Sequence, residues 1–297
     1  MTSVAAARPA ARSYAGAFRR RLGTLPKHVV VIGLMVLWLV PTIGLFVNSF
    51  RPAAAVQSSG WWTFLIHPSQ LTLSNYRYVL AQGGLLPAFV NSLFITIPAT
   101  IIPLFVAAFA AYAFAWMKFP AKNVLFVAVV GLLVVPLQTT FIPILQLYGT
   151  FGLNGQFLAL WLAHTGYGLP FAVYLLRNFM GSLPSEVFES AEIDGASPVT
   201  AFFRLALPMS VPAIAALAIF QFLFVWNDLL VALIYVGATN PDNAPLTVIL
   251  ANLVSSLGSG WWYLAAAAFI AMSVPLAVFF ALQRYFVRGI VSGSVKG

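Results

Sequence analysis

Long uninterrupted runs of apolar residues dominate the hydropathy pattern of this chain. Six of them approach or exceed the about 20 residues that an α-helix needs to cross about 30 Å of hydrocarbon. They occupy residues 29–47, 88–117, 124–148, 157–176, 212–236 and 263–283. The pattern predicts an all-α polytopic membrane protein with six transmembrane helices. A membrane domain at residues 29–297 follows a basic tail at residues 1–28.

Prolines recur inside these runs. A proline inside a helix removes a backbone donor and bends the helix, which a membrane bundle tolerates when neighbouring helices or water satisfy the freed groups. The prolines within the predicted spans are Pro41, Pro98, Pro103, Pro136, Pro143, Pro170 and Pro275. We therefore expect a bundle of bent helices.

The composition agrees with a membrane protein and removes several other classes. Of the 297 residues, 61% are hydrophobic and 7% are charged, whereas soluble domains carry about 25% charged residues. The chain has no cysteine, and its three histidines, His28, His67 and His164, are widely separated, so neither a disulfide nor a metal site is predicted. The net charge of +9 predicts no nucleic-acid partner, because basic residues commonly hold the cytoplasmic loops of membrane proteins.

The distribution of lysine and arginine orients the chain. With the N-terminus in the cytoplasm, only Arg51 and Arg77 of the 15 basic residues lie outside. The opposite orientation would leave only these two inside, so the positive-inside rule places both termini in the cytoplasm. The chain is thus predicted to be a multi-pass protein of the cell membrane, with its basic tail near anionic lipid.

The segment between the fourth and fifth spans, residues 177–211, is net negative on a side that is otherwise rich in cations. It holds four of the six acidic residues of the chain, which are Glu186, Glu189, Glu192 and Asp194. Pro184 marks a helix start, and Glu186 falls in the first turn, where a carboxylate complements the helix dipole. Gly195 then fits a helix stop.

Directly after this stop, Ser197 and Pro198 favour the start of a second short helix. Two interpretations of residues 177–211 follow from the residues alone. One is a helix-turn-helix elbow that lies across the cytoplasmic face and enters a cleft of a cytosolic partner. The other is a solvated loop with surface charge.

The order of residues in this segment is distinctive. Glu189-Ser190-Ala191 precedes Asp194-Gly195-Ala196, and Leu205, Leu207 and Pro208 follow. This order resembles the EAA loop of the permeases of binding-protein-dependent ABC importers, although Ser190 stands where the motif name has alanine. In that family the loop docks into a groove of the ATP-hydrolysing subunit and transmits its motion to the membrane helices.

The resemblance implies a set of coupling residues and several partners. Glu189 would pair with a basic group of the ATPase, and Gly195 would permit the tight turn. Further partners would be a pair of ATPase subunits, a second permease subunit that is a different chain, and an extracytoplasmic solute-binding protein. The residues assigned to ATPase coupling are Glu186, Glu189, Ala191, Asp194, Gly195, Arg204 and Pro208.

Two further matches narrow the resemblance. Trp226-Asn227-Asp228 resembles an element of carbohydrate permeases, and residues 283–297 are similar to the terminus of the maltose-type family. The resemblance covers residue 88 to the end of the chain. It implies a sugar or polyol as the solute, moved by alternating access.

No phosphate-binding loop of the G-x-x-x-x-G-K-[ST] type occurs in the sequence. If the resemblance holds, a separate subunit hydrolyses ATP. We therefore expect no cofactor bound by this chain, no catalytic residues and no enzyme activity of its own.

Asp228 is the only acidic residue inside a predicted span. An ionised aspartate at membrane depth is costly, so it should face protein or water rather than lipid. Gln221 falls on nearly the same face, seven residues earlier. These two residues, with Trp226 stacking a sugar ring and Asn227 beside it, form one predicted solute path. The alternative is structural, with Asp228 capping or bracing a neighbouring helix.

Three rival functions remain open at this point. An ion-coupled secondary transporter usually needs several ionisable groups within the membrane, and this chain offers Asp228 alone. A membrane-embedded enzyme would need a nucleophile with its base, and no such cluster is evident. An ABC permease for a solute other than a sugar is the third possibility.

Overall fold

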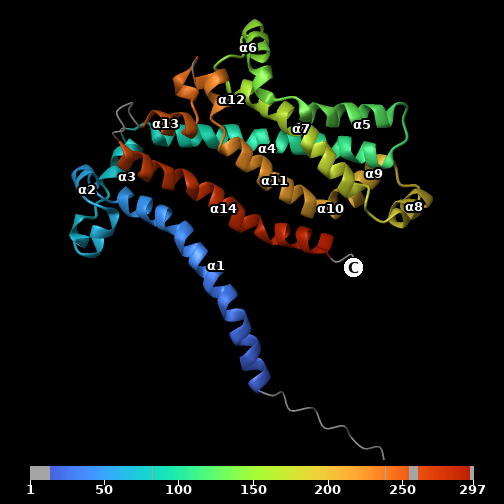
Figure 1. The fold of residues 1–297 in the computed structure, drawn as a ribbon. Coiled ribbons are helices and arrows are strands. Elements are labelled where there is room, and N and C mark those ends of the chain that lie inside the picture. The colour runs from blue at the N-terminus through green and yellow to red at the C-terminus, as the bar shows by residue number, and fades with distance from the viewer. Residues whose placement is uncertain (1–13, 82, 238, 254–259, 295–297) are drawn as a thin grey trace, which may run out of the picture.

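A computed structural model describes residues 14–81, 83–237, 239–253 and 260–294 of the chain. Residues 1–13 of the predicted tail and residues 295–297 of the terminal motif lie outside this part. The described residues form helices and turns without a β-strand, which confirms the all-α prediction (Figure 1).

Within the described ranges, four helices are long and apolar enough to cross a membrane without interruption. They are the residue 26–49 part of α1 (Tyr14–Ser49), α4 (Leu85–Trp116), α7 (Phe157–Met180) and the residue 261–283 part of α14 (Trp261–Ser294). Each contains or closely overlaps one predicted span. α1 begins at Tyr14, so residues 14–28 of the predicted tail continue the first span as helix.

The predicted span at 124–148 is not one helix. It comprises α5 (Lys122–Gly131), two 3₁₀ turns (Leu132–Val134 and Leu137–Thr140) and α6 (Phe141–Thr150). The two halves are bent by 95°. The bend falls at Pro136, which cannot donate a backbone hydrogen bond. The prediction of bent helices is therefore confirmed here, and the continuous helix drawn through 124–148 is corrected to a broken one.

The predicted span at 212–236 is also interrupted. α11 (Val211–Trp226) ends before Asn227, and a short α12 (Leu230–Ala232) and a π-helical turn (Leu233–Gly237) follow. At its other end α11 is bent by 71° from the residue 198–209 segment. With each bent pair counted as one span, the structure has up to six crossings, as the sequence predicts.

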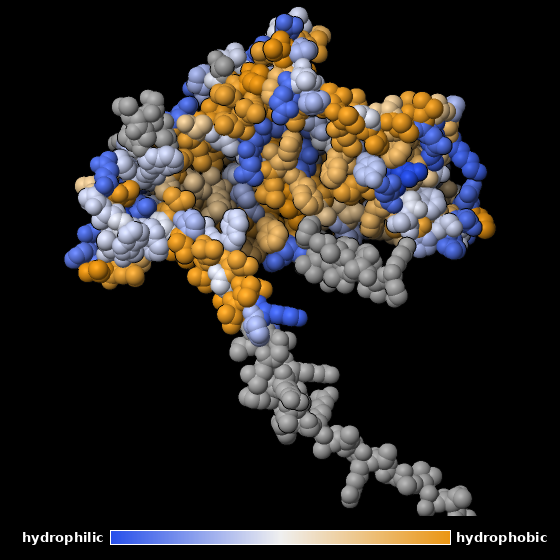
Figure 2. All heavy atoms as spheres, viewed as in Figure 1, coloured by the Kyte–Doolittle hydropathy of each residue, from blue (hydrophilic) through white to orange (hydrophobic). Residues whose placement is uncertain are grey.

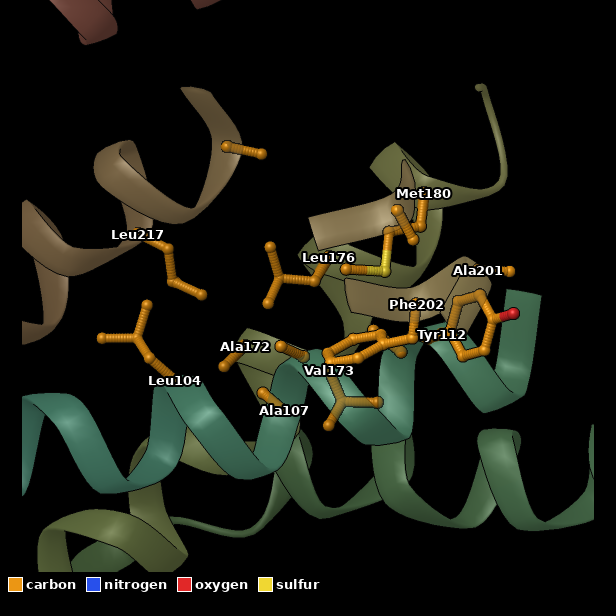
Figure 3. Close-up of a cluster of buried hydrophobic side chains, with 14 of the residues drawn as sticks. Leu104, Ala107, Tyr112, Ala172, Val173, Leu176, Met180, Ala201, Phe202 and Leu217 are labelled. Carbon is orange, nitrogen blue, oxygen red and sulfur yellow. The ribbon is translucent and has the colours of Figure 1, made fainter. Parts of the chain in front are cut away.

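α4 lies at the centre of the bundle (Figure 1). It packs along α7 and also contacts α11 and the residue 246–252 helix, α13 (Leu246–Asn252). Small residues allow this close approach: Ala99, Ala107 and Ala111 are fully buried. In the cluster drawn in Figure 3, Leu104 and Ala107 of α4 meet Val173 and Leu176 of α7.

Most of the outer surface of the bundle is apolar. Orange side chains cover most of the face drawn in Figure 2, and hydrophilic ones lie at both ends and in smaller groups at its top and middle. Many large apolar side chains of α1, α4 and α5 are exposed, among them Trp38, Phe105 and Val124. Because lipid tails solvate such side chains, this surface suits a membrane bundle and would be unfavourable in water.

A small group of short helices closes the end of the bundle opposite α8. It comprises α2 (Ala53–Ser58), two 3₁₀ turns (Trp61–Leu65 and Pro68–Gln70) and α3 (Ser74–Ala81). Arg51 is completely buried in it. Its guanidinium donates to the side chain of Asn48, to the backbone oxygens of Ala55 and Ser59, and to the hydroxyls of Ser59 and Thr63.

Candidate functional site

The acidic segment between α7 and α11 forms the helix-turn-helix elbow that its residues predict. Its first helix, α8 (Ser185–Ile193), begins after Pro184. Gly195 has a φ of +78°, a left-handed conformation that suits glycine. The second helix, α9 (Pro198–Ala201), begins at Ser197, whose hydroxyl accepts a hydrogen bond of 3.2 Å from the Thr200 backbone N–H.

α8 buries one side chain against the bundle. Phe188 is its only buried residue, whereas Ile193 is 87% exposed. The assigned coupling residues Glu186, Glu189, Asp194, Gly195, Arg204 and Pro208 are also exposed, and Ala191 is half-buried. The elbow therefore presents carboxylates and an apolar tip outward, which is the chemistry that a basic, partly apolar groove would bind.

A cavity of about 440 Å³ lies between the elbow and the end of α4. Glu189 and Glu192 of α8 line one side of it, and Met117 and Lys118 line the other. The elbow is thus only partly packed against the membrane helices.

A second polar site lies where α11 ends. The Nε2 group of Gln221 donates to the backbone oxygens of Ala99, at 3.1 Å, and His164, at 3.4 Å. The side chain of Asp228 approaches the same histidine, with 3.8 Å between Asp228 Oδ2 and His164 Nε2. The structure therefore brings Gln221 and Asp228 to one face, as the sequence predicts, and both contact α7 at His164.

Asp228 also satisfies the backbone at the break. Its carboxylate accepts hydrogen bonds from the N–H groups of Val231, at 3.3 Å, and Ala232, at 3.0 Å. Its backbone oxygen accepts a 2.6 Å hydrogen bond from the Thr247 hydroxyl. These contacts are those of the structural alternative, in which Asp228 caps and braces the interrupted helix.

Trp226 and Asn227 differ from each other in exposure. Trp226 is only 4% exposed, stacks on Phe222 at 5.7 Å, and donates its indole N–H to the Ala271 oxygen. In this conformation protein already covers the ring face that a sugar would need. Asn227 is exposed, and its amide donates to the Leu223 oxygen at 2.8 Å.

A chain of hydroxyl groups joins the two interrupted segments. Thr140 donates to the Leu137 oxygen at 2.6 Å and lies 2.9 Å from the Tyr167 hydroxyl. Tyr167 lies 3.0 Å from the hydroxyl of Tyr235, which is fully buried in the π-helical turn. Sequence reasoning missed His164, Tyr167 and Tyr235 as partners, because nothing in their spacing shows which distant residues they meet.

Two adjoining pockets lie beside this chain. One, of about 470 Å³, is lined by Thr140, Tyr148, Tyr167 and apolar side chains of α7. The other, of about 300 Å³, is lined by Tyr167, Gly168, Phe171, Leu217, Phe220, Gln221 and Phe224. Both include Tyr167 and Phe224, so they meet on one face. Their lining is mostly aliphatic and aromatic, with the hydroxyls of Thr140, Tyr148 and Tyr167 and the amide of Gln221, and it carries no charged side chain.

Comparison with known proteins identifies the class. Residues 13–292 match the family described as the inner membrane component of binding-protein-dependent transport systems. The chain belongs to this family, which is one of transporter permeases and not of enzymes. This result favours the ABC permease interpretation over an ion-coupled secondary transporter and over a membrane-embedded enzyme.

Similar curated proteins match over most of the chain. The osmoprotective compounds uptake permease protein GgtD of Synechocystis is 56% identical over 275 residues, which are 92% of each chain. The alpha-glucoside transport system permease protein AglG of Rhizobium meliloti is 55% identical, over 77% of this chain and 62% of the relative. The trehalose permease SugB of Mycobacterium tuberculosis is 31% identical over 87% of this chain and 93% of its own length.

The fold also matches a solved structure. It is similar, with a TM-score of 0.74, to a chain of a bacterial ABC transporter involved in the import of the polysaccharide alginate. The match covers 94% of this chain and all of that one at 20% identity. This likeness confirms the permease fold.

Proposed function

We propose that this chain is the membrane-spanning subunit of an ATP-driven importer for a small, neutral, hydroxyl-rich solute, a sugar or polyol. The observation that carries the proposal is the similarity over most of the chain to permeases named for alpha-glucosides, trehalose and osmoprotective compounds. The two pockets are lined mainly by apolar side chains with a few hydroxyls and one amide, and the absence of a charged side chain from this lining supports a neutral solute over a charged one.

The elbow is the proposed docking site for the ATPase. Its exposed acids and apolar tip suit a groove with basic and apolar groups, and ATP would bind to that partner. Both termini would then lie on the cytoplasmic side with the elbow, as the positive-inside rule predicts. The group of short helices around Arg51 would face the opposite side, towards a solute-binding protein.

Further partners follow from the same proposal. One alginate transporter structure includes a periplasmic protein with a bound alginate pentasaccharide, and its permease resembles this chain with a TM-score of 0.56. We propose an equivalent external receptor here, together with a second permease chain and two ATPase subunits.

The proposed solute path runs along the two pockets. Gln221 contributes its amide there, and Phe171 and Phe224 offer ring faces for a sugar. Asp228 and Trp226 would not line the path but would position the helices around it. Asp228 contacts His164, and Trp226 donates a hydrogen bond to the Ala271 oxygen. Phe171→Ala should then raise the KM for the solute and change the preference among sugars, without loss of the assembled complex.

The main test is purification from native membranes, followed by uptake in proteoliposomes. We expect an ATPase, a second permease and a solute receptor to copurify. Labelled alpha-glucosides or polyols should accumulate in the proteoliposome lumen only when ATP is enclosed there, on the side that corresponds to the cytoplasm. Accumulation driven by an ion gradient without ATP would overturn the proposal. Uptake of amino acids or ions in place of sugars would overturn the solute class alone.

The docking site has its own test. Glu189→Arg reverses an exposed charge of the elbow and should abolish copurification of the ATPase. Asp242→Arg is the matched control, because Asp242 is an exposed acid near the opposite end of α4. Equal retention of the ATPase by both variants would contradict docking at Glu189.

A further inference from the structure

Three aromatic side chains form a stripe along the last turns of α4. Phe109, Tyr112 and Trp116 are spaced three and four residues apart, so they share one face of the helix. The first helical part of the elbow places Phe188 on this stripe, and the second stacks Phe202 on it, with Phe203 edge to face on Phe109 at 5.9 Å. We call the three aromatic residues of α4 together with Phe188 and Phe202 the aromatic clasp: Phe109, Tyr112, Trp116, Phe188 and Phe202.

The first contact of the clasp joins α8 to the end of α4. Phe188 stacks on Trp116 with ring centroids 4.0 Å apart and planes inclined by 20°. The indole N–H of Trp116 donates a 3.0 Å hydrogen bond to the oxygen of Met180, the last residue of α7. Trp116 is therefore fixed in orientation from one side and stacked from the other.

The second contact joins the π-helical turn after α9, Phe202–Ala206, to α4. Phe202 stacks on Phe109 with centroids 4.5 Å apart, and its edge contacts Tyr112 at 5.3 Å. Figure 3 shows Phe202 and Tyr112 side by side above α4. Phe202 is almost completely buried, so this contact excludes solvent.

The remaining space under α8 is not filled. The cavity of about 440 Å³ separates Glu189 and Glu192 from Met117 and Lys118. Since Phe188 is the only buried residue of α8, a displacement of α8 reaches α4 chiefly through the Phe188–Trp116 stack. The chain itself connects the elbow only to α7 and α11.

The opposite end of α4 is fastened to a different part of the molecule. Asn91 donates to the backbone oxygens of Asp242 and Ala244, at 2.8 and 3.1 Å. The hydroxyl of Ser92 accepts a 2.8 Å hydrogen bond from the backbone N–H of Leu246, at the start of α13.

α4 stays one helix between these two attachments. It spans 32 residues without interruption, in spite of Pro98 and Pro103. The predicted third span, in contrast, is bent by 95°, and the predicted fifth span is interrupted after Trp226. At 1.5 Å per residue, α4 reaches about 48 Å, which is enough to cross the hydrocarbon core.

We propose that α4 is the lever of this subunit. The aromatic clasp moves α4 together with the elbow. Asn91 and Ser92 then transmit that movement to the 242–246 segment, at the end of α4 opposite the elbow. Trp116 and Phe188 are positioning residues in this scheme, because neither touches solute or nucleotide. The inference rests on the proposed docking of an ATPase at the elbow.

The test is made on the whole transporter in proteoliposomes, with ATP hydrolysis and solute uptake measured on the same sample. Phe188→Ala and Trp116→Ala should keep the ATPase bound and hydrolysing, and should lower the solute moved per ATP about tenfold. The double variant should fall no further than either single variant, because both remove the same contact. Trp116→Phe keeps a ring and should restore most of the coupling.

Phe94→Ala is the matched control. Phe94 lies on α4 and contacts the rings of Phe157 and Trp161 in α7, away from the elbow. We expect its ratio of uptake to hydrolysis to stay at the wild-type value. Should Phe188→Ala not accumulate in membranes, Phe188→Leu keeps the apolar volume without the ring and is predicted to show the same uncoupling.

An unchanged ratio in the Phe188 and Trp116 variants, with the ATPase bound, would overturn the lever. So would additive losses in the double variant. Failure of the proposed function would look different, because wild-type protein and the Glu189→Arg variant would then both lack an ATPase partner.

Discussion

The two interrupted membrane segments satisfy the backbone groups freed at their breaks in different ways. In the segment at 122–150 the bend falls at Pro136, which lacks an N–H, and the hydroxyls of Thr139 and Thr140 bind carbonyl oxygens one turn back. In the segment at 211–237 the break follows Asn227, where Asp228 accepts two backbone N–H groups.

The difference lies in which backbone groups the break sets free. A proline leaves no donor to satisfy, so the first break needs only local hydroxyls. The second break frees donors at membrane depth, where an unsatisfied N–H is costly, and it needs a side-chain acceptor, which Asp228 supplies. That carboxylate also lies 3.8 Å from His164 Nε2, so the second break adjoins a residue of a distant helix.

The largest expected effect is at Asp228. Asp228→Leu leaves the N–H groups of Val231 and Ala232 without their acceptor, and should lower the free energy of unfolding in detergent by about 3 kcal/mol. Asp228→Asn keeps a capping oxygen and should cost less than about 1 kcal/mol. Denaturation of the purified complex by SDS measures both values. Equal losses would show that the charge, not the cap, stabilises the break.

The next largest effect is expected where Gly168 of α7 packs against Gln221 of α11. A Cβ at Gly168 would lie 2.5 Å from Gln221 Oε1, so Gly168→Ala must displace the amide from Ala99 and His164. We expect a loss of about 2 kcal/mol and reduced uptake. Gly166→Ala, two residues earlier on the same helix, meets nothing within 4 Å and is the matched control. A similar loss in both variants would point to the helix backbone instead.

At the first break, Thr140→Val removes one hydroxyl of the Thr140–Tyr167–Tyr235 chain. The expected loss is about 1 kcal/mol, because one hydrogen bond to Tyr167 is lost. Thr139→Val is the control, since the Thr139 hydroxyl bonds only the Pro136 oxygen among the contacts described. The same SDS titration applies. No difference between the two variants would mean that the chain does not stabilise the junction.

The smallest effect is expected at Pro136. Pro136→Ala restores an N–H at a residue whose φ of −62° alanine also adopts. We expect a loss of only about 0.5 kcal/mol, mainly from the greater freedom of the unfolded chain. Thermal unfolding in detergent would detect it. A loss as large as that of Asp228→Leu would remove the distinction between the two breaks.

Local signals explain what the sequence predicts well. Pro184, Gly195 and Ser197 act on their own neighbours, and the structure confirms the helix start, the stop and the cap that they indicate. The uninterrupted apolar runs likewise predict α4 and α7 to within a few residues at each end.

Long-range contacts account for the features that the sequence does not predict. Neither proline nor glycine occurs in residues 226–236, and Asp228 at the break there bonds the Thr247 hydroxyl through its backbone oxygen and lies 3.8 Å from His164 of another helix. The burial of Trp226 depends equally on Phe222 and on α14. The roles of the coupling residues and of the solute path stay predictions, with the experiments above as their tests.

The arginine enclosed at the far end of the bundle has a practical consequence. The oxygens that bind the Arg51 guanidinium all belong to residues 48–63, and Asn75 secures the same turn from α3. Apart from Asn48 and Ser49 at the end of α1, the groups that bind this charge and its turn lie in the short helices and turns up to Asn75. Because most of the bonds to Arg51 are local in sequence, an exchange of residues 48–76 between related permeases would carry the buried arginine together with its partners.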